Sequence, residues 1–106
     1  MDHSFYRNTA VSRGLIYHYY LSKAVNGKPN LLFCHGFPSK SNDWRYIVPY
    51  FKRRGYGIIV PDMLGYGGTD KPTDPSAYVG SKIAKDLVEI LDAENIEKVI
   101  AIGHDW

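Results

Sequence analysis

Three short apolar runs recur along the chain, at residues 31–34, 57–61 and 99–102. Each places bulky apolar side chains on both faces of an extended segment, without the alternation that marks a half-exposed strand. Such runs are typical of strands buried on both faces, as in a parallel sheet covered by helices. We therefore expect three buried strands, the last of them opened by Lys98.

The N-terminal segment has a shorter and more aromatic pattern. Residues 5–22 indicate two strands joined by a turn at Arg13-Gly14, and the second strand, residues 15–21, is bulky on both faces. We expect an antiparallel hairpin at an edge of the sheet. His18 is a lone histidine on this second strand, so a hydrogen-bonded structural role is favoured over metal ligation.

Between the three buried strands lie segments in which apolar residues recur at the spacing of a helix. Pro49 fits the first turn of one helical segment and Gly55 its end. The apolar residues of that segment are Trp44, Ile47, Val48 and Phe51. Residues 78–95 predict a second, amphipathic helix, with Asp86 on its polar side. The expected apolar face consists of Ile83, Ala84, Leu87, Val88, Ile90 and Leu91.

The order of elements predicts an α/β fold in one domain. A hairpin is followed by strand, helix, strand, helix and strand, which implies a mainly parallel sheet with right-handed crossovers and helices on both faces. In open sheets of this kind a functional site lies at the carboxyl ends of the strands. The residues that directly follow each strand are therefore the first candidates for chemistry.

The last buried strand leads into Gly103-His104-Asp105-Trp106. A strand followed by Gly-x-nucleophile-x is typical of the nucleophile elbow, a sharp turn that holds one reactive side chain above the edge of the sheet. A carboxylate at that position attacks a saturated carbon and forms an ester that water later cleaves. The alternative is that Asp105 only follows the strand and caps the next helix.

A second motif, His35-Gly36-Phe37-Pro38, follows the first buried strand. Glycine permits a close turn and proline restricts the backbone, so the segment is suited to aiming a backbone N–H group. Both motifs are expected at the same edge of the sheet, and this favours the elbow interpretation of Asp105.

Other patterns exclude several classes of function. The glycine-rich residues 62–72 match neither a phosphate-binding P-loop nor a dinucleotide fingerprint, so we expect a structural loop. The lone Cys34 lies in an apolar strand and is interpreted as core.

The 106 residues carry a net charge of +2, too little to predict a nucleic-acid partner. No signal peptide and no membrane-spanning run is visible, and we expect a cytoplasmic protein without metal or cofactor.

Four motifs, in order, carry a resemblance to a known family. They are residues 33–38, 44–46, 62–67 and 103–106, and together they resemble the N-terminal half of the α/β-hydrolase-fold epoxide hydrolases. The resemblance implies that Asp105 is the nucleophile that opens a small hydrophobic epoxide. It also implies an oxyanion hole made by the backbone N–H groups of Phe37 and Trp106, with Pro38 setting the loop, and with His35 and Gly36 as supporting residues of the motif.

The same resemblance implies an incomplete core domain over residues 1–106. The family uses a downstream histidine with an acidic partner to activate water, and two lid tyrosines to protonate the leaving alkoxide. Neither can be assigned in this sequence, so the lid and the C-terminal half of the fold are expected to be absent. The 106-residue chain is accordingly expected to be inactive alone, and its oligomeric state is unknown.

Two alternative functions remain open. Haloalkane dehalogenases of this fold usually have asparagine at the position of Phe37, and haloacetate dehalogenases commonly have arginine at the position of Trp106. Both enzymes also form an ester on the elbow aspartate. The other alternative is a ligand-binding protein on the same fold that has lost its chemistry, because fold alone does not establish function.

Overall fold

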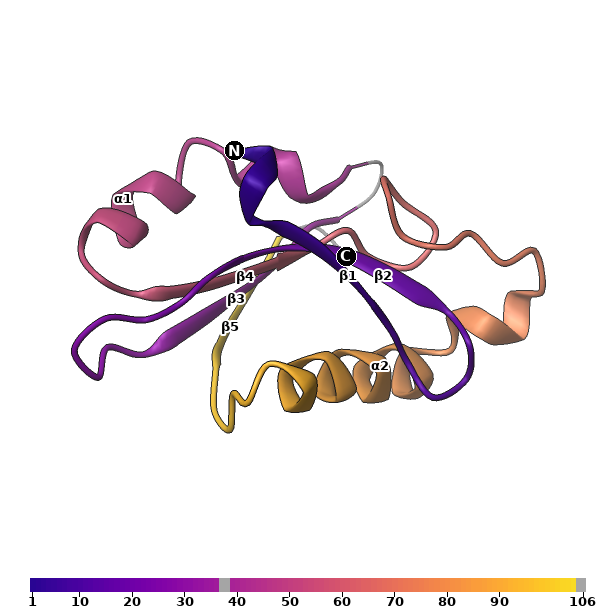
Figure 1. The fold of residues 1–106 in the computed structure, drawn as a ribbon. Helices are drawn as coiled ribbons and strands as arrows, with labels where there is room; N and C mark the ends of the chain where they lie inside the picture. Colours follow the sequence, from indigo (N-terminus) through magenta and orange to yellow (C-terminus); the bar gives the residue numbers. More distant parts are fainter. Residues whose placement is uncertain (37–38, 105–106) are drawn as a thin grey trace.

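The computed structural model describes residues 1–36 and 39–104, which form a single five-stranded sheet with a helix on each face (Figure 1). The strands are β1 (Tyr6–Ala10), β2 (Ile16–Ser22), β3 (Asn30–Cys34), β4 (Gly57–Pro61) and β5 (Ile100–Gly103). The helices are α1 (Val48–Arg53) and α2 (Gly80–Ala93), and short 3₁₀ turns cover His3–Phe5, Ser41–Trp44 and Pro75–Tyr78. No helix in the described part of the chain is long and apolar enough to cross a membrane.

The sheet is mixed, with the strand order β1-β2-β4-β3-β5. β1 pairs antiparallel with β2, and β2 pairs antiparallel with β4. β3 lies between β4 and β5 and runs parallel to both. The predicted α/β architecture, an antiparallel hairpin followed by parallel strands and flanking helices, is therefore confirmed.

The predicted hairpin turn is also confirmed. Gly14 has φ +87°, and the turn closes with a 2.9 Å hydrogen bond from the Val11 N–H to the Leu15 carbonyl. A positive φ is accessible to glycine at little cost, which explains its place here. β1 forms one edge of the sheet, as expected for the first strand of the hairpin.

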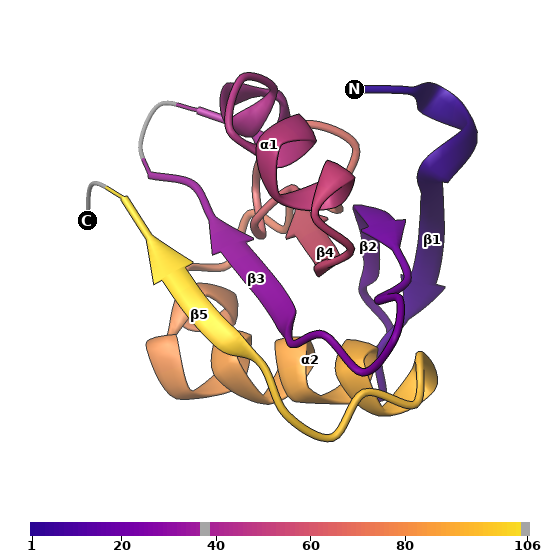
Figure 2. The ribbon, with the colours of Figure 1, turned by 90° about the vertical axis from the view of Figure 1, so that its left-hand side faces the viewer.

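Each face of the sheet carries its own hydrophobic core, because α1 and α2 cover opposite faces (Figures 1 and 2). The core on the α1 face is built from Tyr20, Leu31, Phe33, Trp44, Val48, Ile58 and Val60. The core on the α2 face is built from Val11, Tyr17, Tyr19, Leu21, Leu32, Ile59, Leu64 and Ile90. Alternate residues of β2, β3 and β4 point to opposite faces, so these central strands carry bulky side chains that contribute to both cores.

The expectation that the last strand is buried on both faces is wrong. Ile100 is 53% exposed, and β5 begins there rather than at Lys98. β5 pairs with β3 but has no second neighbour among the described residues, and Figure 2 shows it at the outer edge of the sheet. The apolar side chains of β5 are suited to burial, but in this structure they are buried only in part.

The predicted apolar face of α2 needs one correction. Ala84 and Val88 are exposed, whereas Asp86 is 1% exposed and faces the sheet. The Asp86 carboxylate is accommodated there because Arg13 and Tyr17 both donate hydrogen bonds to it. A buried charge is tolerated when it is paired and hydrogen-bonded, which residue periodicity alone cannot reveal.

The first helical segment divides into two elements. Trp44 belongs to a 3₁₀ turn, and α1 proper begins at Val48 with Pro49 in its first turn. Gly55 follows the helix with φ +84° and ends it, as predicted.

Candidate active site

The two predicted motifs meet at one end of the sheet. β3 and β5 are parallel neighbours, and their last residues, Cys34 and Gly103, are register partners. Directly beyond them, the His104 N–H donates a 3.2 Å hydrogen bond to the Cys34 carbonyl. The described halves of both motifs, His35-Gly36 and Gly103-His104, consequently lie side by side at the carboxyl ends of their strands.

His35 is held firmly at this edge. Its side chain is 8% exposed, and its Nε2 atom accepts a 2.9 Å hydrogen bond from the Met63 N–H in the loop after β4. Its Nδ1 atom lies 2.9 Å from the Gly36 carbonyl oxygen. The Tyr66 ring packs edge-on against the imidazole, with 5.1 Å between the ring centroids. The imidazole thus links the end of β3 to the loop after β4.

Asp62 organises the glycine-rich loop. Its carboxylate is buried and accepts hydrogen bonds from the Ser41 N–H at 2.7 Å and from the Gly68 N–H at 2.9 Å. Gly67 has φ +52°, and a Cβ atom there would lie 2.4 Å from the carboxylate, so a larger residue does not fit. These contacts support the prediction of a shaped structural loop, because the Gly68 N–H is directed at Asp62 and other N–H groups of the loop, such as those of Gly65 and Thr69, bind backbone carbonyls within it.

A cavity of about 210 Å³ opens at this edge of the sheet. Its lining consists of His35, Gly36, Ser39, Asp43, Trp44, Ile47 and His104. The Trp44 indole packs edge-on against His104 at 6.4 Å between centroids. Its Nε1 atom is buried and has no hydrogen-bond partner in the described part of the chain. An unpaired buried donor costs about 1–3 kcal/mol, so Trp44 Nε1 marks a place where a hydrogen-bond acceptor would be stabilised.

Four of the predicted site residues lie outside the described residues: Phe37, Pro38, Asp105 and Trp106. The structure brings together the residues that precede them in each motif. Trp44, Asp62 and Met63 also belong to this edge, although sequence reasoning assigned them no role there. All three lie in motifs that carry the family resemblance, residues 44–46 and 62–67, and Asp62 also carried a signal of its own as a polar residue directly after a buried strand.

The remaining candidate residues have structural roles. His18 Nδ1 lies 2.7 Å from the Asn8 side-chain oxygen, and its ring stacks on Tyr6, so the predicted structural role of His18 is confirmed. Cys34 packs partly buried against the core on the α2 face, and burial raises the pKa of its thiol, which disfavours the nucleophilic thiolate. Within residues 1–36 and 39–104, no cluster of three or more His, Cys, Asp or Glu could hold a metal ion.

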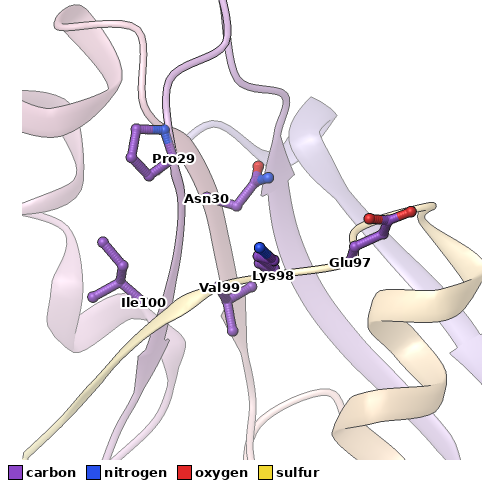
Figure 3. A pocket seen from close by; sticks show the side chains of 6 residues that line it. All are labelled: Pro29, Asn30, Glu97, Lys98, Val99 and Ile100. Carbon is purple, nitrogen blue, oxygen red and sulfur yellow. The ribbon is translucent and has the colours of Figure 1, made fainter.

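A wider hollow of about 610 Å³ lies at the opposite end of the sheet (Figure 3). It is lined by Pro29, Asn30, Glu97, Lys98, Val99 and Ile100, where β3 and β5 begin. It gathers no set of groups suited to catalysis. The cavity at the carboxyl ends of the strands is therefore the better candidate for a site, although its volume is the smaller of the two.

Comparison with known proteins gives a consistent result. The family model described as "alpha/beta hydrolase fold" matches residues 29–106. Epoxide hydrolase 3 of Siraitia grosvenorii is 45% identical over 83 residues, which are 78% of this chain and 26% of that protein. Epoxide hydrolase A of Mycobacterium tuberculosis is 38% identical over 80 residues, or 76% of this chain and 25% of that protein.

Solved structures show the same relationship. A crystal structure of an epoxide hydrolase from Vigna radiata superposes with a TM-score of 0.84 and 33% identity, over 95% of this chain and 32% of that one. Epoxide hydrolase A from Mycobacterium thermoresistibile superposes with a TM-score of 0.82 and 32% identity, over 95% and 32%. The chain spans about a quarter to a third of the length of these relatives. The chain belongs to the α/β-hydrolase fold family, and within that family it is a homologue of the epoxide hydrolases.

Proposed function

We propose that the protein containing this segment is an epoxide hydrolase, with Asp105 as the nucleophile. The observation that carries the proposal is the pairing of the two strand ends, Cys34 with Gly103, continued by the His104–Cys34 hydrogen bond. This pairing brings His104, which precedes Asp105 in the sequence, beside Cys34, which precedes the His35-Gly36-Phe37-Pro38 motif. The named relatives, all epoxide hydrolases, support the same chemistry.

The proposed reaction has two steps. The Asp105 carboxylate attacks one epoxide carbon, the carbon–oxygen bond breaks, and a hydroxyalkyl ester forms on Asp105. Water then adds to the ester carbonyl, and an oxyanion develops on the former carboxylate oxygen. The backbone N–H groups of Phe37 and Trp106 stabilise that oxyanion, at roughly 3–4 kcal/mol for each well-placed donor. Collapse of the tetrahedral intermediate releases the diol and restores Asp105.

The water-activating base is a separate requirement of this mechanism. His35 is committed to Met63 and Gly36, and His18 to Asn8, so neither is free to act as the base. Because the family resemblance places both groups downstream, we assign the base and the acid that protonates the alkoxide to residues outside this segment. No cofactor enters the proposed reaction, and its only partners are a small hydrophobic epoxide and water.

A single-turnover experiment in oxygen-18 water tests the proposal in the complete gene product. An ester on Asp105 supplies one diol oxygen from the enzyme, so the diol of the first turnover is expected to be largely unlabelled. Direct attack by water on the epoxide would label the diol at once, and this result would exclude the ester mechanism. Asp105→Ala is expected to abolish turnover, whereas Asp92→Ala, at an exposed position of α2, is the matched control. Asp105→Asn is a poorer choice, because deamidation restores the nucleophile.

The alternatives give different outcomes in the same assay. A dehalogenase would release halide from alkyl halides or haloacetates through an ester on Asp105 and leave epoxides unchanged. A ligand-binding protein would bind such compounds without reaction. No observation at the described edge of the sheet favours either alternative over epoxide hydrolysis.

A further inference from the structure

The outward side of α1 carries three large exposed side chains. Tyr46 is 80% exposed, Tyr50 48% and Ile47 44%. Hydrogen bonds from the Ile47 N–H to the Trp44 carbonyl and from the Tyr50 N–H to the Ile47 carbonyl continue the helical turns through this segment. Residues three and four apart then share one side, while Trp44 and Val48 lie in the core on the other side. The three side chains therefore face away from the sheet (Figures 1 and 2).

The same side of α1 is strongly basic. Arg53 and Arg54 follow Tyr50 by three and four residues, and Arg45 precedes Tyr46. Among the described residues, none of these three arginines forms an ion pair. Residues 44–61 hold four of the 13 basic side chains and none of the 11 acidic ones, so the rest of the chain carries two more acidic than basic side chains. The positive charge of the chain is therefore concentrated around α1.

Two of the arginines lie over the exposed tyrosine rings. The guanidinium carbon of Arg45 is 4.6 Å from the centroid of the Tyr46 ring, and that of Arg54 is 3.5 Å from the centroid of the Tyr50 ring. Contacts of this kind hold a cation beside an aromatic ring. An amphipathic side chain can keep its charged group in a polar layer while its apolar part enters an apolar layer. The surface therefore offers positive charge and apolar rings to the same partner.

We propose that the outward side of α1 binds the surface of an anionic lipid membrane. This α1 surface consists of Arg45, Tyr46, Ile47, Tyr50, Arg53 and Arg54. Anionic headgroups attract basic side chains to a membrane, and tyrosine is enriched where the apolar layer meets water. A nucleic acid would pair with the arginines, but it has no apolar layer that could receive Ile47.

The expected binding is reversible and depends on charge. α1 has six residues, so it lies along the membrane surface and does not cross the bilayer. Each arginine near an anionic surface raises the affinity about fivefold. Three arginines therefore predict a difference on the order of 100-fold between anionic and neutral membranes.

The α1 surface adjoins the candidate active site. Ile47 belongs both to this surface and to the lining of the cavity of about 210 Å³ at the carboxyl ends of the strands. A hydrophobic epoxide concentrates in lipid, so a membrane-bound enzyme would meet its substrate close to this cavity. This consequence rests on the proposed function, whereas the membrane binding itself does not.

Sedimentation of the complete gene product with lipid vesicles measures the binding. We expect binding to vesicles of phosphatidylserine and phosphatidylcholine in equal amounts, and binding on the order of 100-fold weaker to phosphatidylcholine alone. Raising the salt from about 0.05 M to about 0.5 M should weaken the first interaction, because salt screens exposed charges. Equal binding to both kinds of vesicle, or binding to neither, would overturn the proposal.

Two double variants with the same change in charge locate the binding. Arg53→Gln with Arg54→Gln should weaken binding to the anionic vesicles about 25-fold. Lys82→Gln with Lys85→Gln removes the same charge from exposed positions of α2, on the opposite face of the sheet, and should weaken it less than about twofold. Melting temperatures confirm that each variant is folded. Equal losses in the two variants would show attraction by net charge alone and would refute a role of α1.

Tyr46→Ala tests the apolar part of the α1 surface. It should weaken binding to the anionic vesicles about fivefold, the effect of withdrawing roughly 40 Å² of apolar surface from lipid. Polyglutamate and duplex DNA are the competing anions, and neither should compete with the vesicles at equal charge. If either binds the protein as tightly as the vesicles do, the surface belongs to an acidic macromolecule and the membrane proposal is wrong.

An epoxide carried in the anionic vesicles separates this inference from the proposed function. Arg53→Gln with Arg54→Gln should slow turnover of the vesicle-borne epoxide and leave turnover of a water-soluble epoxide unchanged. Equal turnover of the vesicle-borne epoxide by this variant and the unsubstituted protein would exclude substrate capture from the membrane. If the unsubstituted protein converts no epoxide at all, the proposed function fails, while vesicle sedimentation still decides whether α1 binds the membrane.

Discussion

The two faces of the sheet are held by different kinds of contact. On the α2 face, acidic side chains of the helix and its C-terminal cap form hydrogen bonds with the N-terminal hairpin. Asp86 binds Arg13 and Tyr17. Glu89 binds Ser12, and Glu94 binds Arg7 and Tyr19. On the α1 face, aromatic rings pack against one another at tilted angles, with 5.0 Å between the ring centroids of Phe33 and Trp44 and 6.1 Å between those of Phe33 and Phe51.

The two kinds of contact constrain different properties: the register of the hairpin on α2 in one case, and the shape of the core in the other. Polar contacts require particular partners at particular distances, so the α2 face fixes how the hairpin lies against the helix. Aromatic packing depends on volume and has looser directional demands. The candidate site stands over the aromatic face, where Trp44 belongs both to the core and to the wall of the small cavity. Damage to the two faces should therefore differ in size and in its dependence on pH and salt.

The largest effect is expected from Phe33→Ala on the aromatic face. Phe33 is 1% exposed, and its removal should lower the free energy of unfolding by about 4 kcal/mol through lost burial and the cavity left behind. Urea denaturation of the complete gene product measures this change. Tyr46→Ala, at a ring that is 80% exposed, is the control and should cost less than about 0.5 kcal/mol. Similar losses in the two variants would contradict the assigned core.

Asp86→Ala should have the next largest effect, about 3 kcal/mol, because it leaves Tyr17 and Arg13 without their shared acceptor. The lower part of the usual range applies, since the Arg13 side chain is 26% exposed and can regain water. Denaturation with and without Arg13→Ala in a double-mutant cycle gives the coupling energy of the pair. A coupling near zero would mean that the α2 face is held by apolar packing alone.

Alkaline pH should weaken the α2 face. Burial, together with the hydrogen bond to Glu94, raises the pKa of Tyr19 from about 10 to about 12. The folded state therefore keeps a proton that the unfolded state loses between pH 10 and pH 12, so stability is complete below pH 10 and falls as pH rises through this window. The fall attributable to Tyr19 is on the order of 2 kcal/mol. Stability curves of Tyr19→Phe should be flatter over this window, and an unchanged slope would count against the contact.

The smallest effect is expected at the exposed end of the α2 network. Arg7 bonds Glu94 at 3.0 Å, but its side chain is 53% exposed, so Arg7→Gln should cost less than about 1 kcal/mol. The difference between Arg7→Gln and the unsubstituted protein should shrink as salt is raised from 0.05 M to 0.5 M, because salt screens exposed pairs. If Arg7→Gln lowers the free energy of unfolding as much as Asp86→Ala does, the exposed pair contributes as much as the buried one, which would contradict the expected order.

Much of this fold follows from local sequence. The buried strands, the turn at Gly14 and the end of α1 at Gly55 depend on residues close together in the chain. The apolar runs predict the strands, and the glycines predict the turn and the end of the helix. The order of the elements then implies the mixed sheet and the edge at which the two motifs meet.

The missed features all depend on partners far apart in the sequence. Asp86 is buried because Arg13, 73 residues away, comes to meet it. The His35 imidazole is oriented by Met63, 28 residues away, which no motif indicates. The exposure of β5 depends on whether a second strand lies beside it, and an apolar run cannot specify how many neighbours it will have.

The free edge of β5 bears on how the chain emerges from the ribosome. Once Gly103 has left the ribosome, both helices and all five strands of the described chain are free to pack, so a layered intermediate can form at that stage. Its outermost strand still presents unpaired backbone groups and the exposed Ile100 side chain, which together form a template for another strand. An edge of this kind pairs as readily with a strand of another molecule as with one of its own chain, so association through β5 is the hazard that this feature creates.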